Sequence, residues 1–331
     1  MKFPGKIAVM GGGSWATALA KLLLDNRTEI VWYFHRNDRI EEFKRTGRNP
    51  AYLSDVVFDT SRIIFTSSIN EAASLADTLL LAMPSPYFKS QIGKLTVDIS
   101  HKAVVSAIKG IVPDDNMIVS DYMENHFHIN SGRSLVVSGP CHAEEVAMGR
   151  QSYLTVGCND IFRAEQFANA LRGPVLRTIT SSDVAGIEYA AVLKNVYAIC
   201  SGICHGLSRG DNFQAMLVSN AVMEMDRFVR TVAPRPRNIC DSVYLGDLLV
   251  TSYSRFSRNH NFGSLIGRGY AVKAARMEMV QTAEGYYAAK CMHQINKRHQ
   301  VTMPIMEGVY SILYHNANPA KAIAQMADTF V

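Results

Sequence analysis

The sequence predicts an α/β domain built on a doubly wound, mostly parallel sheet, followed by an all-α domain. Short apolar runs alternate with helical stretches over the first half, which is typical of a parallel sheet covered on both faces. After about Ser181 only long helical stretches follow. The length of 331 residues suits two domains of roughly 150 residues each. We therefore expect one domain at residues 1–180 and a second at 181–331.

The first domain is expected to contain eight strands. The expected strands are Lys6–Met10, Ile30–Phe34, Ile63–Thr66, Leu79–Met83, Val104–Ile108, Leu135–Ser138, Leu154–Gly157 and Val175–Thr180. Helical spacing between them is found at Ser14–Asp25, Arg39–Arg45, Glu71–Ala76 and Ala164–Leu171.

The second domain is expected to be helical throughout. Its predicted helices are Gly186–Leu207, Gln214–Thr231, Arg276–Arg298, Pro304–Asn316 and Pro319–Thr329. A loop-rich connection is expected over Asn238–Gly269.

Composition excludes several classes of protein. With 48% apolar and 19% charged residues the chain is not intrinsically disordered. A net charge of +5 without a Lys/Arg-dense tract gives little support for nucleic-acid binding, and no apolar run is long enough for stable membrane insertion. The six cysteines show no metal-ligand spacing, so we expect no metal and a cytoplasmic location.

A glycine-rich turn joins the first strand to the first helix. Gly11-Gly12-Gly13-Ser14-Trp15-Ala16 has the form G-x-G-x-x-A, a variant of the dinucleotide fingerprint of Rossmann-type domains. Gly11 would make the tight turn, and Gly13 would let the backbone approach a pyrophosphate at the helix N-terminus. The alternative interpretation is an ordinary tight turn.

The end of the second strand bears on the choice of cofactor. It reads Phe34-His35-Arg36-Asn37, with no acidic residue before Asp38. An Arg at this place can pair with a ribose 2′-phosphate, which favours NADPH and leaves NADH possible. A solvated surface Arg36 is the alternative.

Two lysines stand out because of their surroundings. Lys109 follows an apolar strand, at the sheet edge that faces ligands, although it could equally extend to water. Lys194 lies on an apolar, small-residue face of a helix, and burial there would lower its pKa towards the range of a general acid. Alternatively, Lys194 lies at the helix rim, paired with Glu188 or another acid.

The long connection of the second domain also contains polar residues suited to a site. Gly246-Asp247-Leu248-Leu249-Val250-Thr251 and Ser257-Arg258-Asn259 combine acidic, hydroxyl, guanidinium and amide groups. Arg and Asn could bind a phosphate, whereas the alternative is a capped surface loop.

Taken together, these segments resemble the NAD(P)-dependent glycerol-3-phosphate dehydrogenases of the bacterial cytoplasmic type. The resemblance runs in consistent order along nearly the whole chain. It rests on GGGSWATALA, Asn49-x-x-Tyr52-Leu53, Met83-Pro84-Ser85, AIKG, SGPCHAEEVA, VLKNVYAI, GDLLVT, SRNHNFG and AEGY. Departures are Ala16 for the third fingerprint glycine, Cys141-His142 after Gly139-Pro140, Ser54-Asp55 after Tyr52-Leu53, and Cys204-His205 within the segment 202–207.

The resemblance implies roles for individual residues. Lys194 would be the catalytic proton donor and acceptor, supported by Lys109, Asp247 and Asn195. Substrate contacts would come from Lys109, Gly139, Cys141, Lys194, Asp247, Thr251, Ser257, Arg258 and Asn259. Cofactor contacts would come from Gly11, Gly13, Ser14, Trp15, His35, Arg36, Pro84, Lys109, Ala143, Arg258 and Glu284.

The implied reaction is reversible reduction of dihydroxyacetone phosphate to sn-glycerol 3-phosphate with NADPH or NADH, feeding glycerophospholipid synthesis. The expected partners are this small phosphorylated substrate and a second copy of the chain in a homodimer. Two alternatives remain: a related two-domain dehydrogenase of the ketopantoate reductase or 6-phosphogluconate type, and a non-catalytic cofactor sensor.

Overall fold

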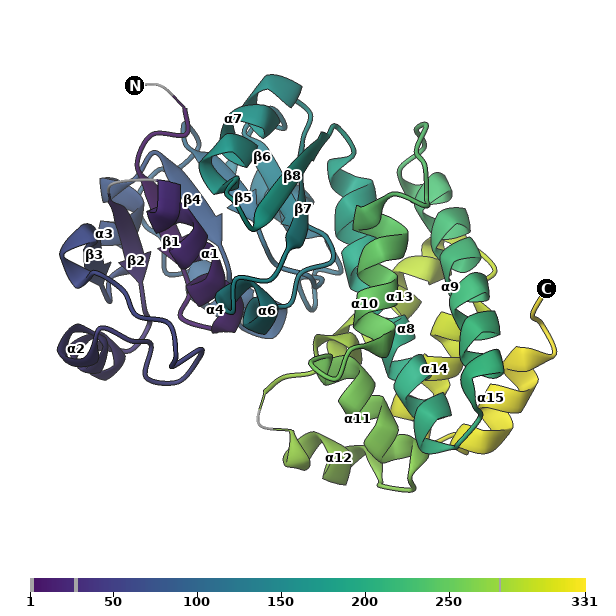
Figure 1. The fold of residues 1–331 in the computed structure, drawn as a ribbon. Helices are drawn as coiled ribbons and strands as arrows, with labels where there is room; N and C mark the ends of the chain where they lie inside the picture. Colours follow the sequence, from purple (N-terminus) through teal and green to yellow (C-terminus); the bar gives the residue numbers. More distant parts are fainter. Residues whose placement is uncertain (1–2, 27–28, 280) are drawn as a thin grey trace. The chain divides into compact units, whose positions relative to one another are not determined.

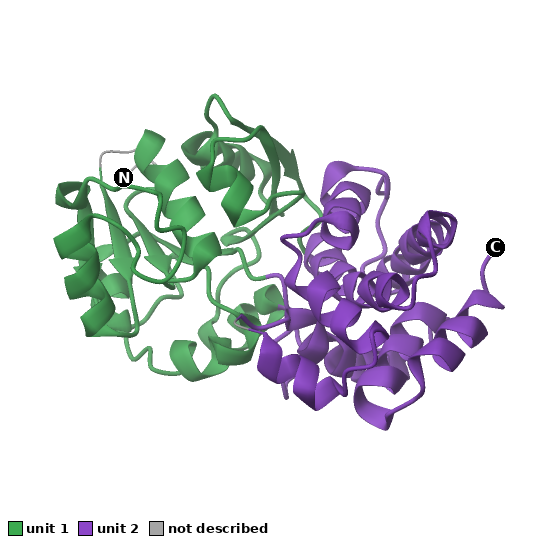
Figure 2. Cartoon of the chain, turned by 60° about the horizontal axis from the view of Figure 1, so that its bottom comes forward, with its two compact units in different colours: residues 1–108, 119–184 green, residues 109–118, 185–331 purple. Residues whose placement is uncertain are grey.

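A computed structural model describes residues 3–26, 29–279 and 281–331. The chain forms two compact units, coloured separately in Figure 2. The first comprises residues 1–108 and 119–184, and the second comprises residues 109–118 and 185–331. Residues 109–118 follow the fifth strand of the sheet but belong to the helical unit.

The first unit is built on one eight-stranded sheet (Figure 1). Its strands are β1 (Ile7–Met10), β2 (Ile30–Tyr33), β3 (Ile63–Thr66), β4 (Thr78–Leu81), β5 (Ala103–Ser106), β6 (Ser134–Ser138), β7 (Ser152–Cys158) and β8 (Leu176–Ser181). The order is β3-β2-β1-β4-β5-β6-β7-β8, and only the β6–β7 pair is antiparallel. The predicted doubly wound, mostly parallel sheet is confirmed.

Burial explains why the strands could be found from apolar runs. Every residue of β1, β2, β4, β5 and β6 is buried, as expected for strands covered on both faces. In the edge strand β8 only Leu176 is buried, and the following residues alternate between exposed and partly buried.

The helices of the first unit cover the two faces of the sheet. They are α1 (Ser14–Asn26), α2 (Asn37–Thr46), α3 (Ile69–Leu75), α4 (Ser85–Ile92), α5 (Val119–Phe127), α6 (Ala143–Ala147) and α7 (Ile161–Leu171), with a 3₁₀ turn at Thr60–Arg62. Helix α1 packs against both α6 and α7. After β3, at one edge of the sheet, the chain crosses back and forms β4 on the other side of β1. Because such crossovers are right-handed, α3 lies on the face of the sheet opposite α1. Helices α4, α5 and α6 were not predicted from the sequence.

An aromatic cluster holds the end of β2 in place. The Trp32 ring packs against Phe34, Phe43 and Phe58, with ring centroids 5.1–5.5 Å apart. Its indole Nε1 donates a 2.7 Å hydrogen bond to the carbonyl of Gly11. The cluster therefore couples the glycine turn after β1 to the strand beside it.

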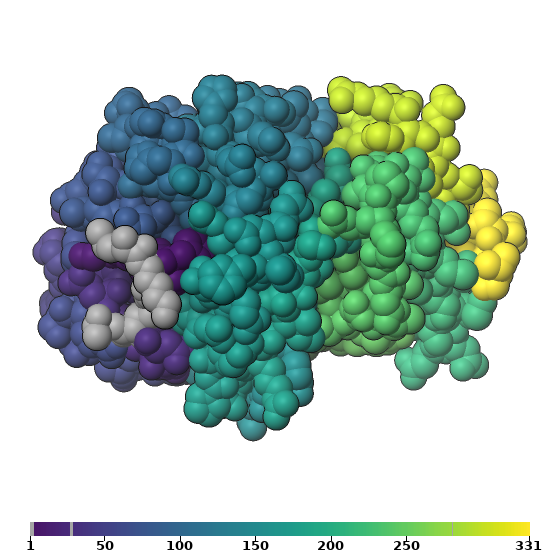
Figure 3. Space-filling model, turned by 90° about the horizontal axis from the view of Figure 1, so that it is seen from above, coloured from purple at the N-terminus to yellow at the C-terminus, as the bar shows by residue number. Residues whose placement is uncertain are grey.

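The second unit is helical, as predicted. Its helices are α8 (Val184–Gly206), α9 (Asp211–Val232), α10 (Asp247–Tyr253), α11 (Arg258–Gly267), α12 (Val272–Glu278), α13 (Glu284–His299), α14 (Pro304–His315) and α15 (Pro319–Ala327), with a π-helical turn at Ser242–Gly246. The C-terminal residue Val331 returns to α9, where the Asn220 side chain bonds both its amide and its carbonyl, and Figure 3 shows the yellow C-terminal end beside green residues. Within the described ranges no helix is long and apolar enough to cross a membrane.

Two predictions about this unit were wrong. The expected loop at Asn238–Gly269 is largely helical, because it contains the π-helical turn, α10 and α11. The expected helix Arg276–Arg298 is two helices: α12 ends at Glu278 and α13 begins at Glu284. Val280, inside that prediction, lies outside the described residues.

Candidate functional site

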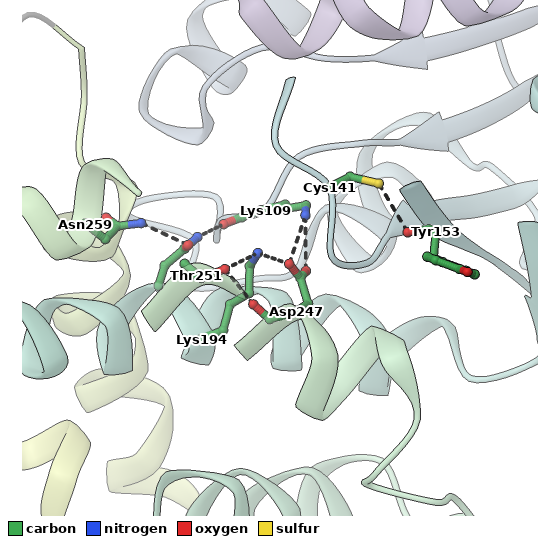
Figure 4. Close-up of polar contacts among 8 residues, drawn as sticks. Lys109, Cys141, Tyr153, Lys194, Asp247, Thr251 and Asn259 are labelled. Atoms are coloured by element: carbon green, nitrogen blue, oxygen red, sulfur yellow. Dashed lines mark hydrogen bonds and ion pairs between the residues drawn. The ribbon is translucent and has the colours of Figure 1, made fainter. Parts of the chain in front are cut away.

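One buried carboxylate in the second unit binds two lysines. Asp247 begins α10 and is 1% exposed. Its Oδ1 accepts a 2.5 Å hydrogen bond from Nζ of Lys194, and its Oδ2 lies 3.1 Å from Nζ of Lys109 (Figure 4). Two cations and one anion leave a local charge of +1 when all three groups are ionised.

A hydroxyl group completes the surroundings of Lys194. Thr251 lies one turn after Asp247 on α10, and its Oγ1 donates a 2.6 Å hydrogen bond to the Asp247 carbonyl. The same oxygen accepts from Lys194 Nζ at 3.0 Å. Lys194 is 4% exposed, and the apolar helix face predicted around it is buried as well. Its carboxylate partner is Asp247. The alternative interpretation from the sequence had paired Lys194 with Glu188 or another acid.

Burial changes the proton affinity of the lysine. Loss of hydration lowers the pKa of Lys194 to about 7, with a further lowering from Lys109, while Asp247 opposes the shift. For Asp247 itself burial acts to raise the pKa, but the Lys109 and Lys194 ammonium groups outweigh it, and the pKa is lowered. The pair thus combines a permanent carboxylate with an amine that exchanges its proton near neutral pH.

A relay of amide groups fixes the backbone beside Lys109. Asn195 Nδ2 donates to the Lys109 carbonyl at 2.7 Å, and Asn259 Nδ2 donates to Asn195 Oδ1 at 2.9 Å. The other end of the Asn259 amide accepts from the Gly285 backbone N–H at 2.9 Å. Four segments of the second unit therefore meet through three hydrogen bonds.

Gly285 contributes to this network, although the sequence alone did not indicate it. A Cβ on Gly285 would lie 2.5 Å from the Asn195 carbonyl oxygen, so only glycine lets α13 approach α8 this closely. The signal was present in the quoted AEGY segment, where Glu284 alone was assigned a role.

Glycines also bring α8 and α11 into backbone contact. A Cβ on Gly202 would lie 2.0 Å from the carbonyl oxygen of His260, and one on Gly263 would lie 2.1 Å from that of Ile199. The pattern repeats one turn on at Gly206 and Gly267. This close packing places Asn259, in the first turn of α11, against Asn195 of α8.

The start of α11 holds the remaining predicted substrate residues. Ser257 caps the helix by accepting from the His260 N–H at 3.2 Å. Arg258 is the first helical residue and is exposed. Arg258 therefore lies at a helix N-terminus, where anions bind favourably.

The glycine turn of the first unit fits a dinucleotide. Gly11 has φ +135°, and a Cβ there would lie 2.4 Å from the Ala82 carbonyl oxygen, which explains the first glycine. No atom of the described chain lies within 4 Å of a Cβ built on Gly13, so open space faces the second glycine. Helix α1 begins at Ser14, followed by Trp15, with no acid in its first turn to repel an anion. The turn lies where the strand order reverses between β1 and β4.

Asn49 supports this turn from outside the fingerprint. It is 1% exposed, and its Nδ2 donates to the Gly12 carbonyl at 3.1 Å and to Thr17 Oγ1 at 2.7 Å. Asn49 is part of the Asn49-x-x-Tyr52-Leu53 motif, but the sequence suggested no role for it. Nothing local in the sequence indicates contact with a turn 37 residues earlier.

The other residues predicted for the first unit lie after different strands. His35 and Arg36 follow β2 and are exposed, and Pro84 precedes α4 as its N-cap. Gly139, Cys141 and Ala143 follow β6, and the thiol of Cys141 donates to the Tyr153 carbonyl at 3.2 Å (Figure 4).

Hydrogen bonds thus join six of the predicted residues into one network within the second unit. They are Lys109, Lys194, Asn195, Asp247, Thr251 and Asn259. Ser257, Arg258 and Glu284 lie at the starts of the adjacent helices α11 and α13.

Comparison with known proteins gives consistent matches. The N-terminal family model of NAD-dependent glycerol-3-phosphate dehydrogenase matches residues 6–164, and the C-terminal one matches residues 183–324. A glycerol-3-phosphate dehydrogenase [NAD(P)+] of Lysinibacillus sphaericus is 33% identical over 320 residues, covering 96% of this chain and 94% of that protein. The Bacillus subtilis protein of the same name is 33% identical over 323 residues, covering 97% and 93%.

A solved structure agrees with these matches. The crystal structure of a glycerol-3-phosphate dehydrogenase from Coxiella burnetii has a TM-score of 0.89 at 25% identity. It covers 98% of this chain and 99% of its own.

Proposed function

Because this chain belongs to the NAD(P)-dependent glycerol-3-phosphate dehydrogenase family, we propose that it interconverts dihydroxyacetone phosphate and sn-glycerol 3-phosphate, with Lys194 transferring the proton. One observation carries the assignment: a buried lysine with a lowered pKa, held by the Asp247 carboxylate and the Thr251 hydroxyl. The first unit would bind the cofactor and the second the substrate. The product would feed glycerophospholipid synthesis.

Lys194 has the properties required of an acid and a base. When the C2 carbonyl is reduced, negative charge develops on its oxygen, and a nearby ammonium both stabilises that charge and donates the proton. Since the pKa of Lys194 is lowered to about 7, the neutral amine needed for the reverse reaction is also accessible. Thr251 and Asp247 hold two directions around Nζ and leave a third for the substrate oxygen.

Lys109 and Asn195 would support this proton transfer. Lys109 shares the Asp247 carboxylate, so its charge adds positive potential beside the reacting oxygen and keeps the pKa of Lys194 low. Asn195 holds the backbone of Lys109 through its carbonyl, which fixes the distance between the two lysines.

The phosphate of the substrate would be bound at the start of α11. Arg258 offers a planar fork at the helix N-terminus, capped by Ser257. Asn259 uses one amide hydrogen for Asn195, and its second can be donated to the phosphate. Gly139 and Cys141 are proposed as further substrate contacts.

The cofactor would be held by the first unit's glycine turn. Gly11, Gly13, Ser14 and Trp15 would contact the pyrophosphate region, and His35 and Arg36 the adenosine end. When bound, the reduced nicotinamide supplies the hydride. Pro84, Lys109, Ala143, Arg258 and Glu284 are proposed as additional cofactor contacts.

A homodimer and a cytoplasmic location complete the proposal. The six cysteines carry no disulfide within the described chain, which suits a reducing compartment. Size-exclusion chromatography with light scattering tests the dimer.

An oxidation assay tests the proposed reaction. Dihydroxyacetone phosphate should drive loss of reduced-nicotinamide absorbance, with NADPH and NADH measured separately, whereas dihydroxyacetone without phosphate should support little turnover. Faster turnover of ketopantoate would favour a related dehydrogenase instead. Tight NADPH binding without turnover of any substrate would indicate a cofactor sensor.

A further inference from the structure

The guanidinium assigned to the cofactor already has an anionic partner. Arg36 Nε donates to Asp38 Oδ1 at 3.0 Å, and Arg36 Nη2 donates to Asp38 Oδ2. The pairing is bidentate, and it occupies two of the five guanidinium N–H groups through which a phosphate monoester could bind. Both side chains are more than half exposed, so solvent screens the pair and it can open.

Asp38 lies among cations at the end of β2. Burial and the nearby charges of Arg36, Lys94 and Arg39 lower the pKa of His35, and Asp38 opposes these cations. The hydrogen bond from Arg36 in turn lowers the pKa of Asp38, so its carboxylate is ionised at neutral pH. Asp38 is therefore an anion of the protein itself, placed where the surrounding positive charge would also attract the phosphate of a cofactor.

The two cofactors would meet this carboxylate differently. The 2′-phosphate of NADPH needs the Arg36 fork and is repelled by a second anion on it. The 2′-hydroxyl of NADH can instead donate a hydrogen bond to a carboxylate, as acidic residues do at this place in dinucleotide-binding domains.

We propose that Asp38 is a specificity-determining residue: it competes with the 2′-phosphate of NADPH for Arg36 and accepts the 2′-hydroxyl of NADH. This inference rests on the proposed assignment of Arg36 to the cofactor. Asp38 therefore makes the affinity for NADPH exceed the affinity for NADH by less than it would with Arg36 alone.

Direct binding measurements test the role of Asp38. NADPH and NADH are titrated into wild type and Asp38→Asn, and Kd is taken from reduced-nicotinamide fluorescence. The ratio of the NADH Kd to the NADPH Kd should rise about tenfold in Asp38→Asn, since the carboxylate that competes for the charge-assisted hydrogen bonds of Arg36 is removed. An unchanged or smaller ratio would overturn the proposal.

A matched control separates competition from overall charge. Glu41 lies on the same helix α2 and pairs with Lys44 at 3.6 Å. Glu41→Gln removes the same charge without touching Arg36, and should change the ratio by less than about twofold, as expected of a screened exposed charge. An equal shift in both variants would contradict a specific role for Asp38.

The Arg36→Ala background distinguishes this inference from the proposed function. Arg36→Ala alone should weaken NADPH far more than NADH, and adding Asp38→Asn to it should no longer strengthen NADPH binding. If Arg36→Ala weakens both cofactors equally, the assignment of Arg36 to the 2′-phosphate fails. If Arg36→Ala discriminates and Asp38→Asn leaves the ratio unchanged, only the role of Asp38 fails.

Discussion

Nζ of Lys194 lies 2.5 Å from Oδ1 of Asp247, although the two residues are 53 positions apart in the chain. The lysine side chain is 5% exposed and the aspartate side chain 1%. Removing Asp247 would leave both lysines without their shared carboxylate, and breaking such a buried pair costs about 3–5 kcal/mol.

Removing the amine should abolish most of the turnover. Lys194→Ala is expected to lower kcat by about 10²–10⁴-fold, the usual contribution of a positioned acid or base. Binding of NADPH, measured by fluorescence titration, should stay within about twofold of wild type, because Lys194 is not among the proposed cofactor contacts. Lys290→Ala, an exposed lysine on α13, serves as the control. Near-normal turnover in Lys194→Ala would remove it from the mechanism.

The direction of reaction should determine the pH profile. Because the pKa of Lys194 is lowered to about 7, the proton-donating ammonium is present below that pH and is lost as the pH rises through it. Reduction of the ketone should therefore decline above about pH 7, and oxidation of the alcohol should increase over the same interval. Initial rates in both directions, measured from about pH 5.5 to about pH 9, span the expected midpoint and test this pH dependence.

Two neighbouring variants should move that midpoint in opposite directions. Asp247 raises the pKa of Lys194 and Lys109 lowers it. Asp247→Asn should therefore shift the midpoint of the reduction profile to lower pH, and Lys109→Met should shift it to higher pH. Circular dichroism would establish that each variant is folded. Shifts of the same sign would show that another group controls the profile.

Loss of the guanidinium at the start of α11 should affect substrate binding. Arg258→Ala is expected to raise KM for dihydroxyacetone phosphate by about tenfold or more, since a charge-assisted hydrogen bond contributes roughly 1.5–3 kcal/mol. Arg255→Ala, an exposed arginine three positions earlier, should leave KM unchanged. An unaltered KM in Arg258→Ala would place the phosphate elsewhere.

Separating α8 from α11 should damage both stability and catalysis. In Gly263→Ala the new Cβ would lie 2.1 Å from the Ile199 carbonyl oxygen, so the helices must move apart. We expect a loss of about 1–3 kcal/mol in the free energy of unfolding, as for other overpacked sites. A lowered kcat should accompany it, because Asn259 would lose its place beside Asn195.

Thermal denaturation and kinetics together test whether the close packing of α8 against α11 supports the site. Gly173→Ala, where a Cβ would meet nothing within 4 Å, provides the control and should leave both measurements unchanged. If Gly263→Ala matches that control, close packing of α8 and α11 does not support the site.

The sequence alone revealed the sheet because its strands are buried runs. β1 and β2 are continuous apolar segments, and β4, β5 and β6 are apolar except for Thr or Ser at their ends. The alternation of these segments with helices indicated a parallel sheet. It did not reveal α10 and α11, because the mixed polar segment 246–267 lacks a clear apolar stripe. The polar side chains there bind Lys194 and Asn195 of α8 instead of water.

By itself, the sequence determined which residue types could perform the chemistry: a glycine turn opening a helix, a lysine on an apolar helix face, and polar residues in a later segment. Only the tertiary structure decided how they combine. It paired Lys194 with Asp247 and not with Glu188, grouped Lys109 with the helical unit, and revealed the contacts of Asn49, Gly285 and Asp38. The physical reason is that local periodicity reports burial, whereas hydrogen bonds and ion pairs between distant segments depend on how the helices pack.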